Sequence, residues 1–190
     1  NSKKLLSAHG IQTRMMSYHE HSSEKESQKI VDLLLEGNDL ALISDAGTPT
    51  ISDPGYGLIR ECIKHEIRII PIPGVSAITA AMSASGLPSD SFTFHGFLPQ
   101  KKGRLKKIQD LSHIDNTIIL FESPYRLVKT LTQLLESLGD RSVVVGRELT
   151  KLYEEIIRGN LSEVLEYFSK SKVKGEIVIM IGKKDDRIHF

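Results

Sequence analysis

The sequence has 190 residues, with 25 Lys and Arg against 24 Asp and Glu, so its formal net charge of +1 favours neither nucleic acid nor a membrane surface. Hydrophobic residues make up 39% and charged residues 26%, as is ordinary for a globular protein with a core. No apolar run approaches the roughly 20 residues that span a bilayer. The single cysteine, Cys62, excludes an internal disulfide and a cysteine-rich zinc site, and we expect a soluble, cytoplasmic protein without a metal.

The first half of the chain alternates helix and strand signals. In order, the residues predict a helix over 2–9, a strand over 11–18, a helix from a Ser23–Glu26 capping box to Gly37, a strand over 40–43, a helix from Asp53 to about His65, a strand over 67–72 and a helix of small residues from Ser76 to Ser85. Strands separated by helices pair in parallel through right-handed crossovers, so a mostly parallel sheet is expected here.

Two glycine-rich loops follow the strands expected at 40–43 and 67–72. The stretch DLALISDAGTPTISDPGY places Asp45 and Asp53 in the first loop, and Pro73 and Gly74 start the second. Ligands of open α/β sheets bind beyond the carboxyl ends of the strands, so the two loops are expected to form one crevice. Neither loop matches the P-loop or the dinucleotide pattern, and the two carboxylates would repel phosphate.

An acidic loop instead suits a ligand with amines, hydroxyls or a positively charged sulfur, and S-adenosylmethionine is such a ligand. The alternative is that Asp45 and Asp53 are only turn and cap residues. Either loop alone supports a site weakly, whereas two neighbouring loops favour one.

The second half begins after a turn-rich break at 86–90, so we expect a first domain over 1–88 and a second over 89–190. Its expected elements are strands over 91–97, 117–121, 143–145, 154–158 and 176–181, a helix from Ser123 and Pro124 to Gly139, and a final helix capped by Asn160 and Glu163. The basic run KKGRLKK, Lys101–Lys107, is expected to contact an RNA backbone, with a solvated helix face as the alternative.

Six segments together resemble one family. SDAGTPTISDPG, PIPGVSAITAA, GFLP, FESPYR, GRELTK and KGEIVIMIG follow the order and spacing of the ribosomal small-subunit RNA (cytidine 2′-O-ribose) methyltransferases of the tetrapyrrole methylase superfamily. The resemblance covers the chain almost from end to end. The superfamily usually carries Gly-Asp-Pro in the first loop, and Gly47-Thr48-Pro49 stands here, which favours an RNA target over a porphyrin-like one.

The resemblance implies an α/β fold of two domains, with a mostly parallel sheet in the first, a mixed sheet in the second and S-adenosylmethionine in the cleft between them. By position, the cofactor-binding residues would be Asp45, Ala46, Gly47, Thr48, Ile51, Ser76 and Ala77. Relatives have a first strand and a Gly-rich loop before the position of Asn1, so we expect a truncated or incompletely resolved chain whose activity is in question. Relatives are commonly homodimers, and a homodimer is expected here.

The implied reaction is methyl transfer to the 2′-hydroxyl of a cytidine ribose in small-subunit ribosomal RNA. Glu122 and Lys151 are the candidates to assist removal of the hydroxyl proton. The candidates for substrate binding are Arg126, Arg147, Lys101, Lys102 and Arg104. Alternatively, Arg147 and Glu148 form a structural ion pair. Two other functions stay open, a tetrapyrrole (precorrin-like) methyltransferase and a non-catalytic binding module.

Overall fold

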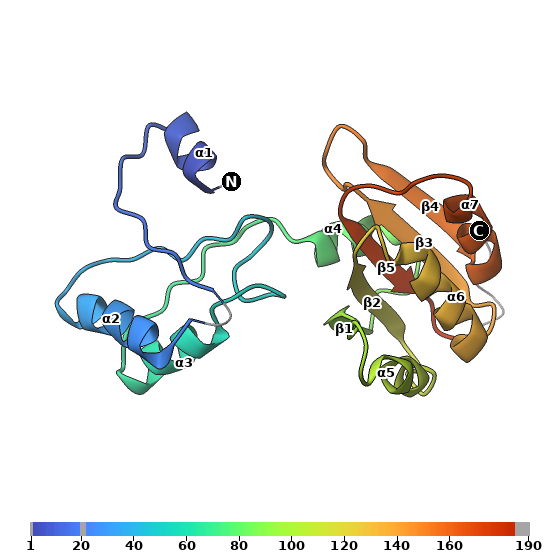
Figure 1. The fold of residues 1–190 in the computed structure, drawn as a ribbon, viewed down its shortest axis with the longest axis horizontal. Coiled ribbons are helices and arrows are strands. Elements are labelled where there is room, and N and C mark those ends of the chain that lie inside the picture. Colours follow the sequence, from blue (N-terminus) through green and yellow to red (C-terminus); the bar gives the residue numbers. More distant parts are fainter. Residues whose placement is uncertain (1, 20–21, 185–190) are drawn as a thin grey trace. The chain divides into compact units, whose positions relative to one another are not determined.

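The computed structural model describes residues 2–19 and 22–184, and the chain divides into two compact units, Asn1–Ser76 and Ala77–Phe190 (Figure 1). The division precedes the expected boundary after residue 88. Helix α4 (Ala77–Ser85) accounts for the difference, because its Ala81 and Met82 pack against the sheet of the second unit. Within the described ranges, the helices are all too short or too polar to cross a membrane.

In residues 2–19 and 22–76 the first unit has three helices, α1 (Ser2–Ala8), α2 (Glu24–Leu35) and α3 (Tyr56–Lys64). The predicted capping box is confirmed, since the Ser23 hydroxyl accepts from the Glu26 amide and the Glu26 carboxylate accepts from the Ser23 amide. Helices α2 and α3 share a small core of Ile30, Val31, Leu58 and Cys62, against which Tyr18, Leu34 and Ile67 pack.

The strands predicted at 11–18, 40–43 and 67–72 are wrong for this structure, because residues 2–19 and 22–76 contain no strand. The expected parallel sheet of the first domain is therefore also absent from these residues. Apolar runs form strands only where a neighbour pairs with their amides and carbonyls and covers their side chains. Here Ile70 is 61% and Ile72 79% exposed, so the runs are extended segments without such a neighbour.

Helix α3 begins at Tyr56 rather than at Asp53, which corrects the predicted cap. The cap position is Gly55, whose φ of 139° suits glycine. A Cβ at Gly55 would lie 2.8 Å from the Thr50 side chain and 2.9 Å from that of Leu42. The loop thus folds back tightly against Gly55, and the helix begins only after this glycine. Asp53 therefore lies in the loop and not at the start of the helix.

The second unit is a five-stranded mixed sheet with four helices, as the predicted fold class requires. The strand order is β1-β2-β5-β3-β4, with β1 and β2 parallel and the other pairs antiparallel. The bounds are β1 (Phe92–Phe97), α5 (Arg104–Leu111), β2 (Thr117–Glu122), α6 (Leu127–Leu138), β3 (Ser142–Arg147), β4 (Glu155–Asn160), α7 (Leu161–Ser169) and β5 (Ile177–Ile181).

The central strands are buried on both faces, which explains their continuous apolar runs. On one face, α5, α6 and α7 cover a large cluster that includes Ile118, Leu131 and Val145, while α4 covers the opposite face, which includes Ile119 (Figure 1). Each of these four side chains has no exposed surface. The fold of this unit is thus secured by two apolar layers.

Helix α6 begins at Leu127, after a turn, and not at Ser123 and Pro124 as predicted. The Arg126 amide donates to the Ser123 carbonyl at 2.9 Å, which closes the turn before the helix. The Arg126 guanidinium donates to the carbonyl of Leu98 at 3.2 Å, which ties the turn to the segment after β1. By contrast, the predicted cap of α7 is confirmed, since Asn160 and Glu163 form a capping box.

The carboxyl ends of β1, β2 and β3 lie at one edge of the sheet. The register fixes this arrangement, because Ile177 at the start of β5 is opposite both Glu122 and Arg147, and β1 runs parallel to β2. Motifs that are far apart in the sequence therefore meet at this edge.

Two alanine substitutions distinguish the packed core from the exposed extended segment. We expect Leu131→Ala to lower the free energy of unfolding by about 2–5 kcal/mol, because it leaves a cavity in the large cluster. Ile70→Ala should change it by no more than about 0.5 kcal/mol, because that side chain is mostly in solvent. Urea denaturation followed by circular dichroism measures both, and a large loss for Ile70→Ala would show that residues 67–72 are buried.

Candidate functional site

The loop between Ser44 and Gly55 is held by its own polar groups. The Ser44 hydroxyl donates a shared hydrogen bond to two carbonyl oxygens, that of Ala46 at 3.0 Å and that of Gly47 at 3.2 Å. Thr50 and Ser52 have φ values of 72° and 59°, which are unfavourable for residues with a Cβ and above all for a β-branched one. Such strained residues cluster at ligand sites, so the loop conformation is a first indication of function.

The two glycine-rich loops are in contact through one hydrogen bond, and the crevice expected between them stays a prediction. The Thr48 hydroxyl donates to the Val75 carbonyl at 2.9 Å. A Cβ at Gly47 would meet nothing within 4 Å, and one at Gly74 would meet only a carbonyl at 3.9 Å. A ligand can therefore approach the backbone of both loops closely.

The loop carries concentrated negative charge. Burial raises the pKa of Asp53 above its usual value, and the charge of Asp45 raises it further, although a hydrogen bond from Ser44 acts in the opposite direction. The Asp45 carboxylate accepts from the hydroxyl of Ser2 at 2.9 Å. Of the other predicted cofactor residues, Ile51 is 45% exposed in this loop, while Ser76 precedes α4 and Ala77 begins it.

These loops fit S-adenosylmethionine better than a phosphate. Carboxylates accept hydrogen bonds from an ammonium and from ribose hydroxyls, and open backbone groups at Gly47 and Gly74 can pair with the polar edge of a base. The loop thus offers carboxylate acceptors that a cationic ligand could use, and its role in binding the cofactor stays a prediction. In the described ranges no group of three or more His, Cys, Asp or Glu side chains is placed to hold a metal ion.

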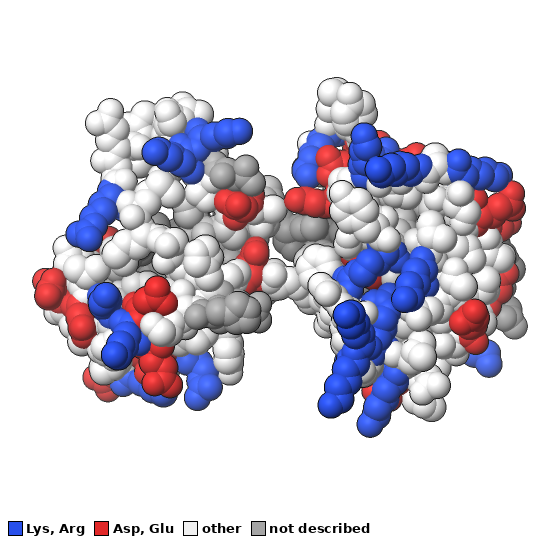
Figure 2. All heavy atoms as spheres, viewed as in Figure 1, with Lys and Arg blue, Asp and Glu red and all other residues white. Residues whose placement is uncertain are grey.

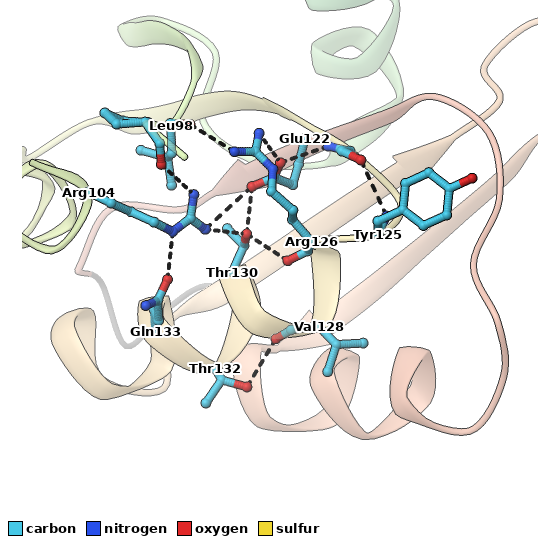
Figure 3. Close-up of polar contacts among 11 residues, drawn as sticks. Leu98, Arg104, Glu122, Tyr125, Arg126, Val128, Thr130, Thr132 and Gln133 are labelled. Atoms are coloured by element: carbon cyan, nitrogen blue, oxygen red, sulfur yellow. Dashed lines mark hydrogen bonds and ion pairs between the residues drawn. The ribbon is translucent and has the colours of Figure 1, made fainter. Parts of the chain in front are cut away.

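In the second unit, Glu122 forms the centre of a buried ionic network at the end of β2 (Figure 3). Its carboxylate has no exposed surface and lies 2.6 Å from the Arg126 guanidinium and 3.5 Å from that of Arg104. The Thr130 hydroxyl donates to the same carboxylate at 2.6 Å, and the Ser123 amide donates to it at 2.7 Å. Both oxygens of the carboxylate are therefore paired.

Arg104 points inward, which corrects its predicted role in contacting RNA. It is 4% exposed, and its guanidinium donates to the side chains of Gln133 and Thr130 and to the Pro99 carbonyl. The sequence pattern did not predict this role, because Arg104 lies within a basic run that is typical of an exposed surface. The first position of α5 nevertheless faces the sheet, as do the buried Ile108 and Leu111 on later turns.

The lysines around Arg104 remain at the surface. Lys101, Lys102 and Lys106 are exposed, and Lys107 is half-buried. In Figure 2, Lys and Arg side chains gather over the part of the second unit where Figure 1 shows β1 and α5. The predicted basic surface is therefore present, without its arginine.

Arg147 and Lys151 lie at the same edge of the sheet but have partners that the sequence did not predict. Arg147 at the end of β3 donates to Glu155 at 2.8 Å, so its ion pair is not with Glu148. Lys151 contacts Glu148 at 2.8 Å and Glu176 at 3.1 Å. The folded sheet brings Glu155 to Arg147 and Glu176 to Lys151, whereas Glu148 is only three residues from Lys151 in the chain.

The geometry suits neither Glu122 nor Lys151 as a free base. Glu122 is enclosed by two arginines and two further donors. The hydrogen bond to Glu148 raises the pKa of Lys151 above its usual value, with a further contribution from Glu176, so Lys151 is an ammonium at neutral pH. A general base must instead be unprotonated and within reach of the proton it removes.

The order of these motifs matches a known family. The family model for Tetrapyrrole (Corrin/Porphyrin) Methylases covers residues 3–165. The chain belongs to the tetrapyrrole (corrin/porphyrin) methylase family. This finding confirms the resemblance for the five segments that lie within residues 3–165. In fold, the chain is similar to the crystal structure of the methyltransferase CobJ, with a TM-score of 0.68 at 18% identity over 96% of this chain and 82% of that one.

Two methylase-family relatives are much closer in sequence, and both are named Ribosomal RNA small subunit methyltransferase I. The protein of Halalkalibacterium halodurans is 45% identical over 98% of this chain. That of Thermotoga maritima is 43% identical over 95%. The chain spans 65% of the length of the first and 82% of the second.

The buried network predicts a large effect at Glu122. We expect Glu122→Ala to lower the free energy of unfolding by about 3–5 kcal/mol, because it leaves Arg104 and Arg126 without a counter-charge. Glu122→Gln, which keeps the hydrogen-bonding shape, should lose less. Urea denaturation measures both.

The control for the Glu122 variants is Glu61→Ala, which breaks an exposed pair with Lys64 and should change stability little. Equal losses for Glu61→Ala and Glu122→Ala would contradict a special role for the buried pair.

The acidic loop predicts that the free protein is more stable without the charge of Asp53. Because the pKa of Asp53 is raised in the folded state, its ionised form destabilises the fold above that pKa, and the penalty disappears below the unfolded value of about 3.9. Asp53→Asn should therefore raise the urea midpoint at pH 7, and the gain should vanish near pH 3.

The matched control is Asp39→Asn, which removes one charge from an exposed position of the same unit. If Asp53→Asn lowers the midpoint at pH 7, the Asp53 carboxylate stabilises the loop instead.

Proposed function

We propose that this chain is an S-adenosylmethionine-dependent methyltransferase that acts on the 2′-hydroxyl of a cytidine ribose in small-subunit ribosomal RNA. The observation that carries the proposal is the identity of 43–45% to relatives named Ribosomal RNA small subunit methyltransferase I, over nearly the whole of this chain. The exposed lysines around α5 support it, because RNA phosphates are bound chiefly by Lys and Arg.

The cofactor would be held by the two joined loops. Asp45 and Asp53 can accept from the ammonium or the ribose hydroxyls, while the backbone of Gly47 is open to close approach. We propose Ala46, Thr48, Ile51, Ser76 and Ala77 as the other contacts. When bound, S-adenosylmethionine supplies a methyl group carried on a positively charged sulfur, and the acidic loop stabilises that charge.

The residues of the second unit position the RNA. An in-line displacement requires the ribose oxygen to be held against the methyl carbon, so positioning supplies much of the rate. The Arg126 side chain is 23% exposed and is anchored by Glu122. It is therefore suited to hold a phosphate in a fixed place. Arg147 lies at the same edge of the sheet, and Lys101 and Lys102 extend the basic surface.

The proton of the 2′-hydroxyl then passes to water. Glu122 orients Arg126, and the Lys151 ammonium, which is paired with Glu148 and Glu176, would help to hold the substrate in place while the oxygen bonds to the methyl carbon. This division gives both residues that the sequence singled out a part in the reaction without requiring either to be an unprotonated base.

One other function is favoured by a specific observation. The description of the family allows a tetrapyrrole methyltransferase. The higher sequence identity lies with the ribosomal RNA enzymes, so we place RNA first. A non-catalytic binding module, a cytoplasmic location and a homodimer stay predictions.

The substrate is tested by transfer of labelled methyl groups. We expect the chain to methylate purified small ribosomal subunits but not uroporphyrinogen, and nuclease digestion of the product to release 2′-O-methylcytidine. Calorimetry with S-adenosylmethionine on the same chain checks the cofactor separately. Binding of the cofactor without transfer to either substrate would leave a binding module, and transfer to uroporphyrinogen alone would replace the RNA assignment.

The assay includes a variant at the edge of the sheet. Arg126→Ala should weaken RNA binding about 10- to 100-fold, the effect of losing one charge-assisted contact, and leave calorimetric affinity for S-adenosylmethionine unchanged. Lys170→Ala is the matched control, because Lys170 is an exposed residue at the C-cap of α7 that pairs with Glu166. An equal loss of both affinities in Arg126→Ala would contradict this division of roles.

A further inference from the structure

Two aromatic side chains are exposed where the parallel strands β1 and β2 end. Phe97, the last residue of β1, is 54% exposed, and Tyr125, in the turn after β2, is 86% exposed. Both strands end at the same edge of the sheet, because Phe97 is in register with Phe121. The functional assignment of the charged residues at this edge leaves these two rings unexplained.

Both rings are attached to rigid parts of the structure. The turn that carries Tyr125 is closed by the bond between the Arg126 amide and the Ser123 carbonyl, and Arg126 is anchored to Glu122 at 2.6 Å. Figure 3 shows the Tyr125 ring directed away from that network. Phe97 rests edge-on against Phe121, with ring centroids 5.8 Å apart.

One hydrogen bond brings the two aromatic positions together. Arg126, the neighbour of Tyr125, donates to the carbonyl of Leu98, the neighbour of Phe97, at 3.2 Å. Arg126, whose side chain is 23% exposed, therefore follows one exposed aromatic residue in the chain and is hydrogen-bonded to the residue that follows the other. Lys129, one turn further on, is also exposed.

We propose that Tyr125 and Phe97 stack on unpaired bases of the RNA substrate, while Arg126 between them holds the connecting phosphate. The inference rests on the proposed function and adds to it that the substrate is single-stranded or unstacked at the point of binding. Aromatic rings beside cationic side chains bind single-stranded nucleic acid in this way, because every base has a face that can stack.

Charge favours RNA over a second protein as the occupant of this surface. Aromatic residues and Arg are common at both protein and RNA interfaces, whereas Lys is depleted at protein interfaces, so the exposed lysines decide between the two. Here the rings adjoin Arg126 and the exposed Lys129, and the basic run with Lys101 and Lys102 follows Phe97 directly along the chain. A polyanion with apolar faces complements this combination.

The test measures binding of fluorescein-labelled oligocytidylate RNA to the full chain by anisotropy. Tyr125→Ala should weaken binding about 5- to 100-fold, the range for loss of one stacked base. It should not weaken binding of a matched oligomer in which abasic riboses replace the nucleosides. Tyr125→Phe should keep the parent affinity, because the ring remains. Phe97→Leu should likewise weaken binding of oligocytidylate but not of the abasic oligomer.

Tyrosine fluorescence provides a direct signal, since the chain has five tyrosines and no tryptophan. RNA should quench the emission of the parent, and the quenching should decrease in Tyr125→Phe although that variant still binds. Tyr153→Ala, which removes an exposed ring from the connection between β3 and β4, is the matched control and should leave affinity unchanged.

The stacking role would be overturned by unchanged RNA affinity in Tyr125→Ala, or by an equal loss of affinity for the abasic oligomer. It would also be overturned if Tyr125→Ala changed the sedimentation of the protein without changing its RNA affinity, because the surface would then lie between copies of the chain. Failure of the parent to bind oligocytidylate would also overturn it. Calorimetry with S-adenosylmethionine and methyl transfer to small ribosomal subunits then judge the proposed function independently.

Discussion

The buried carboxylate of Glu122 is the interaction on which the second unit depends. A charge without solvent exposure is tolerated only when it is paired and hydrogen-bonded, and here two arginines, one hydroxyl and one amide satisfy it. Through these partners the end of β2 is linked to α5 and to the start of α6. A hydrophobic residue could fill the same space, but it would not hold two guanidinium groups in fixed positions.

This network divides the basic residues into two groups. Arg104 is used inside, where it bonds to Thr130, Gln133 and Pro99. Arg126 is held with 23% of its side chain exposed, and its neighbour in the chain, Tyr125, is also exposed. The carboxyl ends of β1, β2 and β3 thus present a surface whose charges are preorganised, and preorganised charge is what positioning of a substrate needs.

The first unit solves a different problem. Its loop gathers the charges of Asp45 and Asp53 and keeps Thr50 and Ser52 in left-handed conformations, none of which favours the free protein. A cationic ligand would offset the charge, and the bond from Thr48 to Val75 holds the second loop in place for it. The loop therefore lowers the stability of the free protein, while the small core around Ile30 and Leu58 holds α2 and α3 together.

The sequence by itself determined what depends on neighbours in the chain. The capping boxes at Ser23 and Asn160, the apolar strands of the second unit, the position of the glycine-rich loops and the family all follow from short patterns, because these contacts span few residues. Tertiary structure decided the rest. Whether the run at 67–72 becomes a strand depends on a pairing neighbour, and whether Arg104 faces water depends on Glu122 and Gln133, far along the chain. The strand register likewise brings Glu155 to Arg147 and Glu176 to Lys151, so that distant charges meet at one edge of the sheet.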